Sequence, residues 1–336
     1  MLGLTLGNFV SSTTRQRFFE KSVDNAYSGN VLFERLRAGA RPWSGGRQIV
    51  KTINIAKRTQ GGSFSGFDTL PTAQEDTRIQ LTANPSEYSS APLVFSGIQL
   101  AVNKGPEAFL DLMAEEFSAS AKDLSDKIGT DLYLDGTGNS NKAIAGLVYH
   151  VDDGTNVTSY EGQSRTTYTN LNSTLTAQSG AIGFDDLSTD SDAAQIGNDS
   201  PNLIVTTPAV FSIIERIVTP TVNVNYGQVL PQGSPTGGME GIGLNYGVNR
   251  LFWRGIPIVA DEKCTSGNIF TLNLNHLFLY TLDYTGEVVE STKEGFAFTG
   301  LKKSNNQNAV VGHLLFAGQL FGDSPRTMAR RTGVTS

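Results

Sequence analysis

The sequence predicts an α+β fold in which a long β-hairpin is followed by one long helix. Apolar and polar residues alternate over residues 48–58 and again over residues 77–83, which is the two-residue period of half-exposed strands. Apolar residues then recur every three or four positions from residue 109 to residue 132, which is typical of an amphipathic helix. Elsewhere a charged fraction of only 17%, 36 glycines and many Ser, Thr and Asn residues favour strands and loops.

The two alternating stretches are expected to pair as an extended hairpin. The sequence between them, GGSFSGFDTLPTAQED, has the glycines, the proline (Pro71) and the acidic residues of a loop tip. An isolated two-stranded ribbon is only marginally stable in water. The hairpin therefore either packs on its own domain or lies on another subunit, and the alternative to an intersubunit role is an ordinary surface hairpin.

The helix is expected to begin near Pro106, because proline suits the first helical position, and to end at Gly136. Roughly 30 residues at about 1.5 Å each would give a rod of about 45 Å. Its apolar stripe is only one face wide, so the other face meets water or a partner. The stripe consists of Phe109, Leu112, Met113, Phe117, Ala121, Leu124, Ile128 and Leu132.

The remaining sequence divides into two zones. In residues 139–262, NLIVTTPAVFSIIERIVTP predicts a buried strand followed by a helix, and FWRGIPIVADE predicts a strand after a glycine-rich loop. From about residue 265 onward, strand-like runs predict a second, mostly antiparallel sheet. The run AVVGHLLFAGQLFG is expected to be buried, and the tail after Asp323 is expected to be exposed.

Charge is distributed unevenly along the chain. Residues 1–58 carry ten Lys and Arg against three acids, residues 302–336 carry five against one, and residues 59–301 carry eleven against 28. The basic ends could bind nucleic acid or the acidic body of a neighbouring copy. The second is favoured, because the basic residues are scattered through the predicted elements and form no dense run.

Other classes of protein receive little support. No apolar run approaches about 18 residues and no signal peptide is evident, so no membrane association is expected. The single cysteine, Cys264, excludes an internal disulfide framework. The three histidines lie far apart, and the acidic run Asp185–Asp192 is interpreted as a solvated loop because it lacks the glycine and terminal glutamate of a calcium loop. No catalytic residue, metal or cofactor is predicted, and the protein is not expected to be an enzyme.

The order of these parts resembles the major capsid proteins of tailed bacteriophages of the Hong Kong 97 type. The resemblance depends on the hairpin, on the helix that ends near LYLDGTGNSNKAIAGL, and on the stretches LIVTTPAVFSIIERI and RGIPIVADE. It implies five parts: an N-terminal arm (1–45), an extended hairpin loop (46–95), the spine helix of a peripheral domain (96–138), an axial domain (139–262), and the peripheral domain sheet with a C-terminal tail (263–336).

The resemblance implies a subunit that self-assembles into pentamers and hexamers of an icosahedral shell around double-stranded phage DNA. The protein would then reside in the virion, assemble in the cytoplasm of a bacterial host, and hold the packaged DNA only loosely. Its expected partners are further copies of itself, a separate scaffolding protein, a portal and, as further candidates, decoration proteins. The alternatives are an encapsulin-like nanocompartment shell protein, a β-rich phage tail or adhesion protein, and a hydrolase of surface polymers.

Some members of that family link subunits covalently through a lysine, an asparagine and a buried acid. Lys51 or Lys57 and Asn305, Asn306 or Asn308 could supply the first two, but no acid occurs from Leu301 through Gly322, so a noncovalent shell is expected. The candidate intersubunit residues are arginines of the basic region, phenylalanines of the hairpin tip and glycines of the loop assigned to the symmetry axes. They are Arg15, Arg17, Arg35, Arg37, Arg41, Arg47, Arg58, Phe64, Phe67, Gly237 and Gly238.

Overall fold

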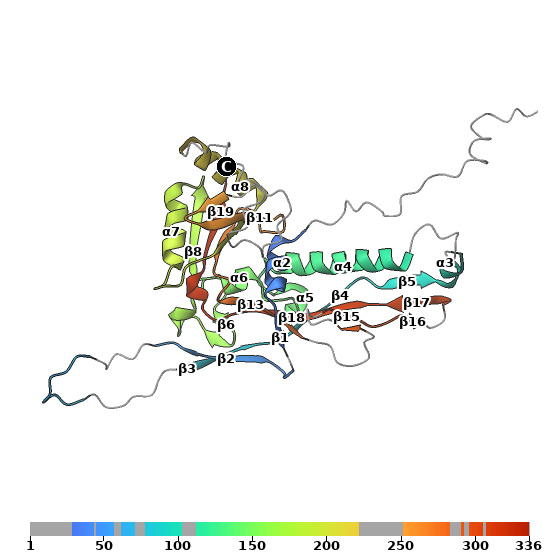
Figure 1. Ribbon diagram of the computed structural model, residues 1–336, viewed down its shortest axis with the longest axis horizontal. Helices are drawn as coiled ribbons and strands as arrows, with labels where there is room; N and C mark the ends of the chain where they lie inside the picture. Colours follow the sequence, from blue (N-terminus) through green and yellow to red (C-terminus); the bar gives the residue numbers. More distant parts are fainter. Residues whose placement is uncertain are drawn as a thin grey trace, which may run out of the picture.

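The computed structural model consists of an elongated body, a block of strands and helices at one end of it, and a β-hairpin that extends away from both (Figure 1). The residues that the structure describes are 29–43, 45–56, 62–70, 78–102, 112–221, 251–282, 290–291, 296–304 and 307–335. Among the helices of these residues, none combines the length and the apolar character needed to cross a membrane.

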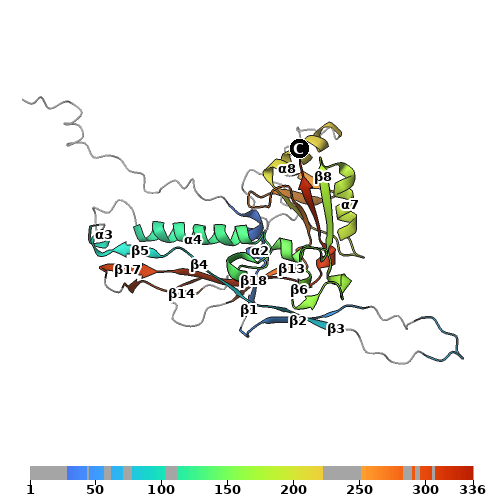
Figure 2. The ribbon, with the colours of Figure 1, turned by 180° about the vertical axis from the view of Figure 1, so that it is seen from behind.

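A six-stranded sheet runs through the elongated body in the order β1-β13-β18-β15-β14, with β4 beside β18. All its pairs are antiparallel except β1 with β13, which agrees with the predicted mostly antiparallel sheet. A three-stranded sheet, β16-β17-β5, continues the body toward helix α3 (Figure 2). The bounds are β1 Arg41–Trp43, β4 Ser86–Ser89, β13 Leu277–Leu282, β14 Glu290–Ser291, β15 Phe296–Phe298, β18 Leu314–Gly322, β5 Leu93–Ser96, β16 Lys302–Lys303, β17 Ala309–Gly312 and α3 Gly97–Val102.

The predicted long helix is confirmed as α4, Leu112–Asp131, which lies along the elongated sheets (Figures 1 and 2). Its expected start at Pro106 lies outside the described residues. The helix ends at Asp131, not at Gly136, because the amide of Tyr133 already bonds three residues back, to the carbonyl of Thr130. Gly136, with φ +81°, then turns the chain into the short turn α5, Gly138–Asn141.

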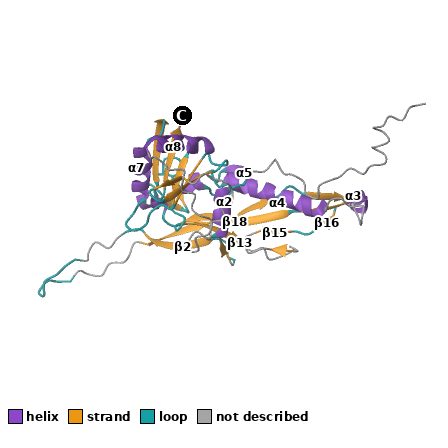
Figure 3. Cartoon of the chain, turned by 45° about the horizontal axis from the view of Figure 1, so that its top comes forward, coloured by secondary structure: helices purple, strands orange, loops and turns teal. Residues whose placement is uncertain are grey.

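A second six-stranded sheet has the order β10-β11-β9-β12-β19-β8, and helices α7 and α8 pack on it (Figure 3). Both helices contribute to one hydrophobic cluster with the sheet, since Leu187 of α7 and Ile214 of α8 belong to the same cluster as Ile204 and Ile258. The bounds are β8 Thr174–Gly180, β9 Leu203–Thr206, β10 Leu251–Trp253, β11 Ile256–Ala260, β12 Ile269–Leu272, β19 Ala329–Val334, α7 Phe184–Ala194 and α8 Pro208–Thr221. The predicted strand and helix over NLIVTTPAVFSIIERIVTP are thus confirmed.

Four expectations from the sequence are wrong in this region. The tail after Asp323 is buried, because β19 inserts between β12 and β8 and leaves Met328 and Val334 only 0% and 4% exposed. The strands after residue 265 therefore do not form one sheet, since β12 and β19 belong to the second. FWRGIPIVADE forms two strands and not one. A tight turn joins them at Arg254 and Gly255, which have φ angles of 48° and 83°. The acidic run is not a loop but helix α7.

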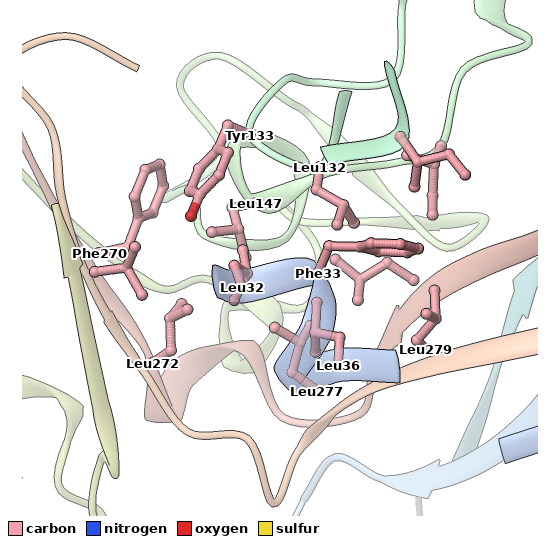
Figure 4. Close-up of a cluster of buried hydrophobic side chains, with 14 of the residues drawn as sticks. Leu32, Phe33, Leu36, Leu132, Tyr133, Leu147, Phe270, Leu272, Leu277 and Leu279 are labelled. Atoms are coloured by element: carbon pink, nitrogen blue, oxygen red, sulfur yellow. The ribbon is translucent and has the colours of Figure 1, made fainter. Parts of the chain in front are cut away.

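The main hydrophobic core joins the two sheets through the short helix α2, Val31–Ala38 (Figure 4). Leu32, Phe33 and Leu36 of α2 are at most 4% exposed and pack between Leu279 of the elongated sheet and Leu272 of the second. Burial of these side chains supplies the main stabilisation of the joint. The remaining elements are α6 Leu147–His150, β6 Ser159–Tyr160, β7 Gln163–Ser164, and the 3-10 turns Thr169–Leu171 and Pro325–Thr327.

Candidate assembly interface

The predicted hairpin is confirmed as strands β2, Ile49–Asn54, and β3, Arg78–Ala83, which pair antiparallel. Alternate residues of β3 are buried, Ile79 and Leu81 among them at 8% and 0% exposure. They pack on Tyr160 and Phe321 of their own chain. The base of the hairpin therefore packs on its own chain, which is the first of the two arrangements that the sequence leaves open.

Polar contacts also fix the base of the hairpin. Lys51 of β2 forms an ion pair with Asp323, whose other carboxylate oxygen lies 2.7 Å from Nδ1 of His276. The side-chain amide of Asn170 donates to the carbonyl of Ile55 at 2.6 Å. Lys51 is thus engaged within its own subunit. Lys57, Asn305 and Asn306, which the sequence also offers for a covalent link, lie outside the described residues.

The tip of the hairpin, residues 62–70, is exposed throughout and lies away from the rest of the chain in both views (Figures 1 and 2). Phe64 is 64% exposed, Phe67 103% and Leu70 63%. A hydrogen bond of 2.7 Å from the amide of Ser65 to the carboxylate of Asp68 holds the turn between them. Three large apolar side chains on one exposed turn are a strong indication of a surface that a partner covers.

A second group of exposed apolar side chains lies at the opposite end of the elongated body. Val94 of β5 is 52% exposed, Ile98 of α3 is 72% exposed, and Phe117 of α4 is 39% exposed although it stacks edge-on with Phe298. Figure 1 shows that this end and the hairpin tip point in opposite directions. One molecule therefore presents apolar surface at both of its ends, which suits contacts between successive copies.

The candidate arginines occupy different environments. Arg37 pairs with Glu34 at 3.6 Å, and the guanidinium of Arg41 lies 3.5 Å from the centre of the Phe278 ring. Arg35 is half-buried, and burial lowers its pKa. Arg47 is exposed beside the hairpin. Arg15, Arg17, Arg58, Gly237 and Gly238 lie outside the described residues, so an intersubunit role remains a prediction for every arginine and glycine in the set.

The described residues contain no group of three or more His, Cys, Asp and Glu side chains that could hold a metal ion. His150 is completely buried and bonds to the hydroxyl of Tyr160 at 2.9 Å, and this burial lowers its pKa to about 3. Burial likewise raises the pKa of the Cys264 thiol to about 12, which leaves it without nucleophilic character at neutral pH.

Two buried arginines are important for the structure and were not singled out from the sequence. Arg165 donates to the carbonyls of Asp152 and Leu171 at 2.5 and 2.7 Å and so holds the segment beneath the hairpin. Arg331 of β19 grips the carboxylate of Asp190 on α7 with two bonds of 2.8 Å. The contact of Arg331 is not local, because Arg331 and Asp190 are 141 residues apart in the sequence. The partners of Arg165 lie 13 and 6 residues away, but they are backbone carbonyls, which leave no sign in the sequence.

No protein-family model matches the sequence, and no curated protein matches it either. In fold, the chain is similar to the capsid of cyanophage A-1(L), with a TM-score of 0.75 and 16% identity over 97% of this chain and 98% of that one. It is also similar to an encapsulin from Synechococcus elongatus, with a TM-score of 0.63 and 13% identity over 99% of this chain and 96% of that one. It is similar as well to the capsid of Myoviridae phage XM1, with a TM-score of 0.57 and 12% identity over 99% of this chain and 100% of that one. The chain therefore has an α+β fold of the Hong Kong 97 type, as its sequence predicts.

Proposed function

We propose that this chain is the major capsid protein of a tailed bacteriophage and that it assembles into pentamers and hexamers of an icosahedral shell around double-stranded DNA. The observation that carries the proposal is the exposed apolar hairpin tip, with Phe64 and Phe67 held away from a base that is fixed to its own subunit. A monomer gains nothing from such a surface, whereas a neighbouring copy can bury it. Similarity to capsid subunits over nearly the whole chain supports the same function.

The parts of the chain have corresponding roles in this proposal. Residues 1–45 form the N-terminal arm, 46–95 the extended loop, 96–138 the spine of the peripheral domain, and 139–262 the axial domain around the symmetry axes. Residues 263–336 complete the peripheral domain, except that β12 and β19 are better grouped with the axial sheet to which they pair.

The partners follow from the same proposal. They are further copies of the chain, a separate scaffolding protein, a portal and decoration proteins, in a virion that forms in the bacterial cytoplasm. The acidic body, with 28 acids against eleven Lys and Arg in residues 59–301, supports loose contact with packaged DNA and pairing with the basic ends of neighbouring copies. The role is structural and not enzymatic.

An encapsulin-like compartment is the second candidate, because the fold similarity to an encapsulin also extends over 99% of this chain. The contents of the particle separate the two. A capsid would package DNA through a portal at one vertex, whereas a compartment would enclose protein cargo and have equivalent vertices. Electron microscopy of particles from an infected or expressing cell distinguishes these outcomes.

The hairpin tip provides the direct test. Phe64→Ser with Phe67→Ser should leave the thermal melting of the unassembled protein within a few degrees of wild type, because both side chains are exposed. The same variant should form few or no shells by negative-stain microscopy. The matched control is Phe64→Leu with Phe67→Leu, which keeps the apolar surface and should assemble.

Two results would contradict the proposal. A serine variant that forms shells as readily as wild type would show that the tip is not an assembly contact. Wild-type protein that forms no closed shell at any concentration, with or without co-expressed phage proteins, would refute the shell function itself.

A further inference from the structure

A polar groove lies beside the base of the hairpin. It has a volume of about 1000 Å³ and is bounded by the end of β3, by the turn that follows α4, and by the β6–β7 hairpin. Three of the described residues that line it are acidic, Glu87, Asp135 and Glu161, and one is basic, Lys142. The groove therefore carries an excess of negative charge.

Glu161 is the unusual residue in this groove. It is 4% exposed, and its Oε1 atom is buried without a hydrogen-bond partner. Burying a carboxyl group that lacks a full set of partners is costly, and such residues persist where another interaction compensates. Nothing in the described part of the chain bonds to this oxygen.

The backbone holds Glu161 in place although its conformation is unfavourable. Glu161 and Gly162 form the two-residue turn between β6 and β7, with φ of 46° and 81°. The first position of such a turn favours Asn, Asp or Gly, because a longer side chain is strained at positive φ. The amide of Glu161 nevertheless donates to the Tyr149 hydroxyl at 2.7 Å, and its carbonyl accepts from the amide of Thr82 on β3 at 2.9 Å.

The nearest internal cation does not satisfy Glu161. Arg165 directs its guanidinium to the backbone carbonyls of Tyr149, Asp152 and Leu171 and forms no ion pair with the Glu161 carboxylate. Lys142 is exposed at the groove. Glu161 is thus both strained in its backbone and buried, and its Oε1 atom has no hydrogen-bond partner among the described residues.

We propose that this groove receives an arginine or lysine side chain from residues 1–58 of a neighbouring copy and that Glu161 is its partner. Charge complementarity selects this occupant, because residues 1–58 carry ten Lys and Arg against three acids while the groove has an acidic excess. A buried, charge-assisted pair of this kind fixes register between subunits and resists dissociation more than exposed pairs do. The inference rests on the proposed shell function, which it deepens by naming one intersubunit contact.

Binding of a cation at Glu161 should change the protonation state of its carboxyl group. Burial raises the pKa of Glu161 to about 8, against a smaller opposing effect of Arg165, so the empty groove holds a protonated carboxyl at neutral pH. Pairing requires the ionised form and therefore releases a proton on assembly. The other titratable groups near Glu161 are Tyr149, Tyr160 and Arg165 on its own side and Glu87, Asp135 and Lys142 around the groove.

The test compares wild type with Glu161→Gln, which keeps the size of the side chain but cannot ionise. Unassembled Glu161→Gln should melt at the wild-type temperature or above, whereas its critical concentration for shell assembly at pH 8 should rise by about tenfold. The wild-type critical concentration should fall as the pH rises from 6 to 8, by up to about tenfold per pH unit. Glu161→Gln should lose this pH dependence. The matched control, Glu262→Gln, makes the same change at an exposed glutamate outside the groove and should behave as wild type.

The outcomes separate this contact from the shell function. Wild-type shells with a Glu161→Gln critical concentration and pH profile equal to those of wild type would overturn the inference and leave the function intact. If Glu161→Gln does not fold, the wild-type pH profile alone decides, because a flat profile between pH 6 and 8 is incompatible with the proton release. Absence of any wild-type shell would overturn both.

Discussion

Helices α2 and α4 meet at Gly129. Replacing this glycine by alanine should have two opposing effects on stability, a gain in helix propensity and a clash with the cap of α2. Asn30 caps α2, and its Oδ1 accepts a hydrogen bond from the amide of Phe33 at 2.8 Å. A Cβ atom at position 129 would overlap the Asn30 amide nitrogen and lie 2.7 Å from its Cγ. Gly129→Ala should therefore displace the cap of α2, even though alanine is the better helix former.

The magnitudes decide the sign. Replacing glycine by alanine inside a helix stabilises by about 1 kcal/mol. Loss of a side-chain cap costs about 1 kcal/mol, and any shift of α2 also disturbs Leu32, Phe33 and Leu36, for which partial loss of core packing costs about 1–2 kcal/mol more. The net expectation is that Gly129→Ala destabilises the unassembled protein by about 1–2 kcal/mol in urea unfolding followed by circular dichroism.

A double-mutant cycle isolates the cause. Asn30→Gly removes the side chain that the new methyl group would meet and weakens the cap only slightly. In that background Gly129→Ala should become neutral or stabilising, so the sign of its effect should reverse. Equal effects of Gly129→Ala in both backgrounds, or a stabilised single variant, would refute the close approach of α2 and α4 as the reason for glycine at this position.

Two further predictions concern buried charge. Arg331→Met should lower the unfolding free energy at pH 7 by about 3–5 kcal/mol, because it leaves Asp190, which is 1% exposed, without its cation. Adding Asp190→Leu should restore most of that loss. A single variant as stable as wild type would contradict the role of the pair. Burial raises the pKa of Glu161 from 4.5 to about 8, so the folded protein keeps a proton that the unfolded chain releases above pH 4.5. The unfolding free energy of wild type should therefore fall relative to that of Glu161→Gln as the pH rises from 4.5 to 8. The change in this difference should be on the order of 3 kcal/mol by about pH 7. Parallel curves of unfolding free energy against pH for the two proteins would show that the carboxyl group is not desolvated.

Elements with a strong local pattern could be predicted from the sequence. The alternation at Ile79 and Leu81 predicts strand β3, and the spacing of Leu124 and Ile128 predicts the buried face of α4, because both patterns depend on neighbours within a few positions. Exposure of Phe64 at the hairpin tip is likewise consistent with the surrounding turn residues. These features were sufficient to predict the fold through the order of its parts.

Features that depend on distant partners could not be predicted in this way. Helix α7 looks like a solvated acidic loop because nothing nearby indicates that Arg331 neutralises Asp190 from 141 residues away. Its start is set by Asp186, whose carboxylate accepts from the amide of Gly183 at 2.7 Å, a signal that is visible in the sequence but weak beside the surrounding charge. Glu161 was missed because a single acid in a polar segment gives no sign of its burial.

The position of β19 has a consequence for the timing of synthesis. Strand β8 pairs in parallel with β19, with Thr174 opposite Ala329, so β8 stays unpaired on that edge until roughly 150 further residues have been translated. At ribosomal rates of about 5–20 residues per second this interval lasts on the order of ten seconds. During that time the sheet that carries α7 is incomplete. In the proposed shell, this delay would keep a nascent chain from joining other copies while it is still attached to the ribosome.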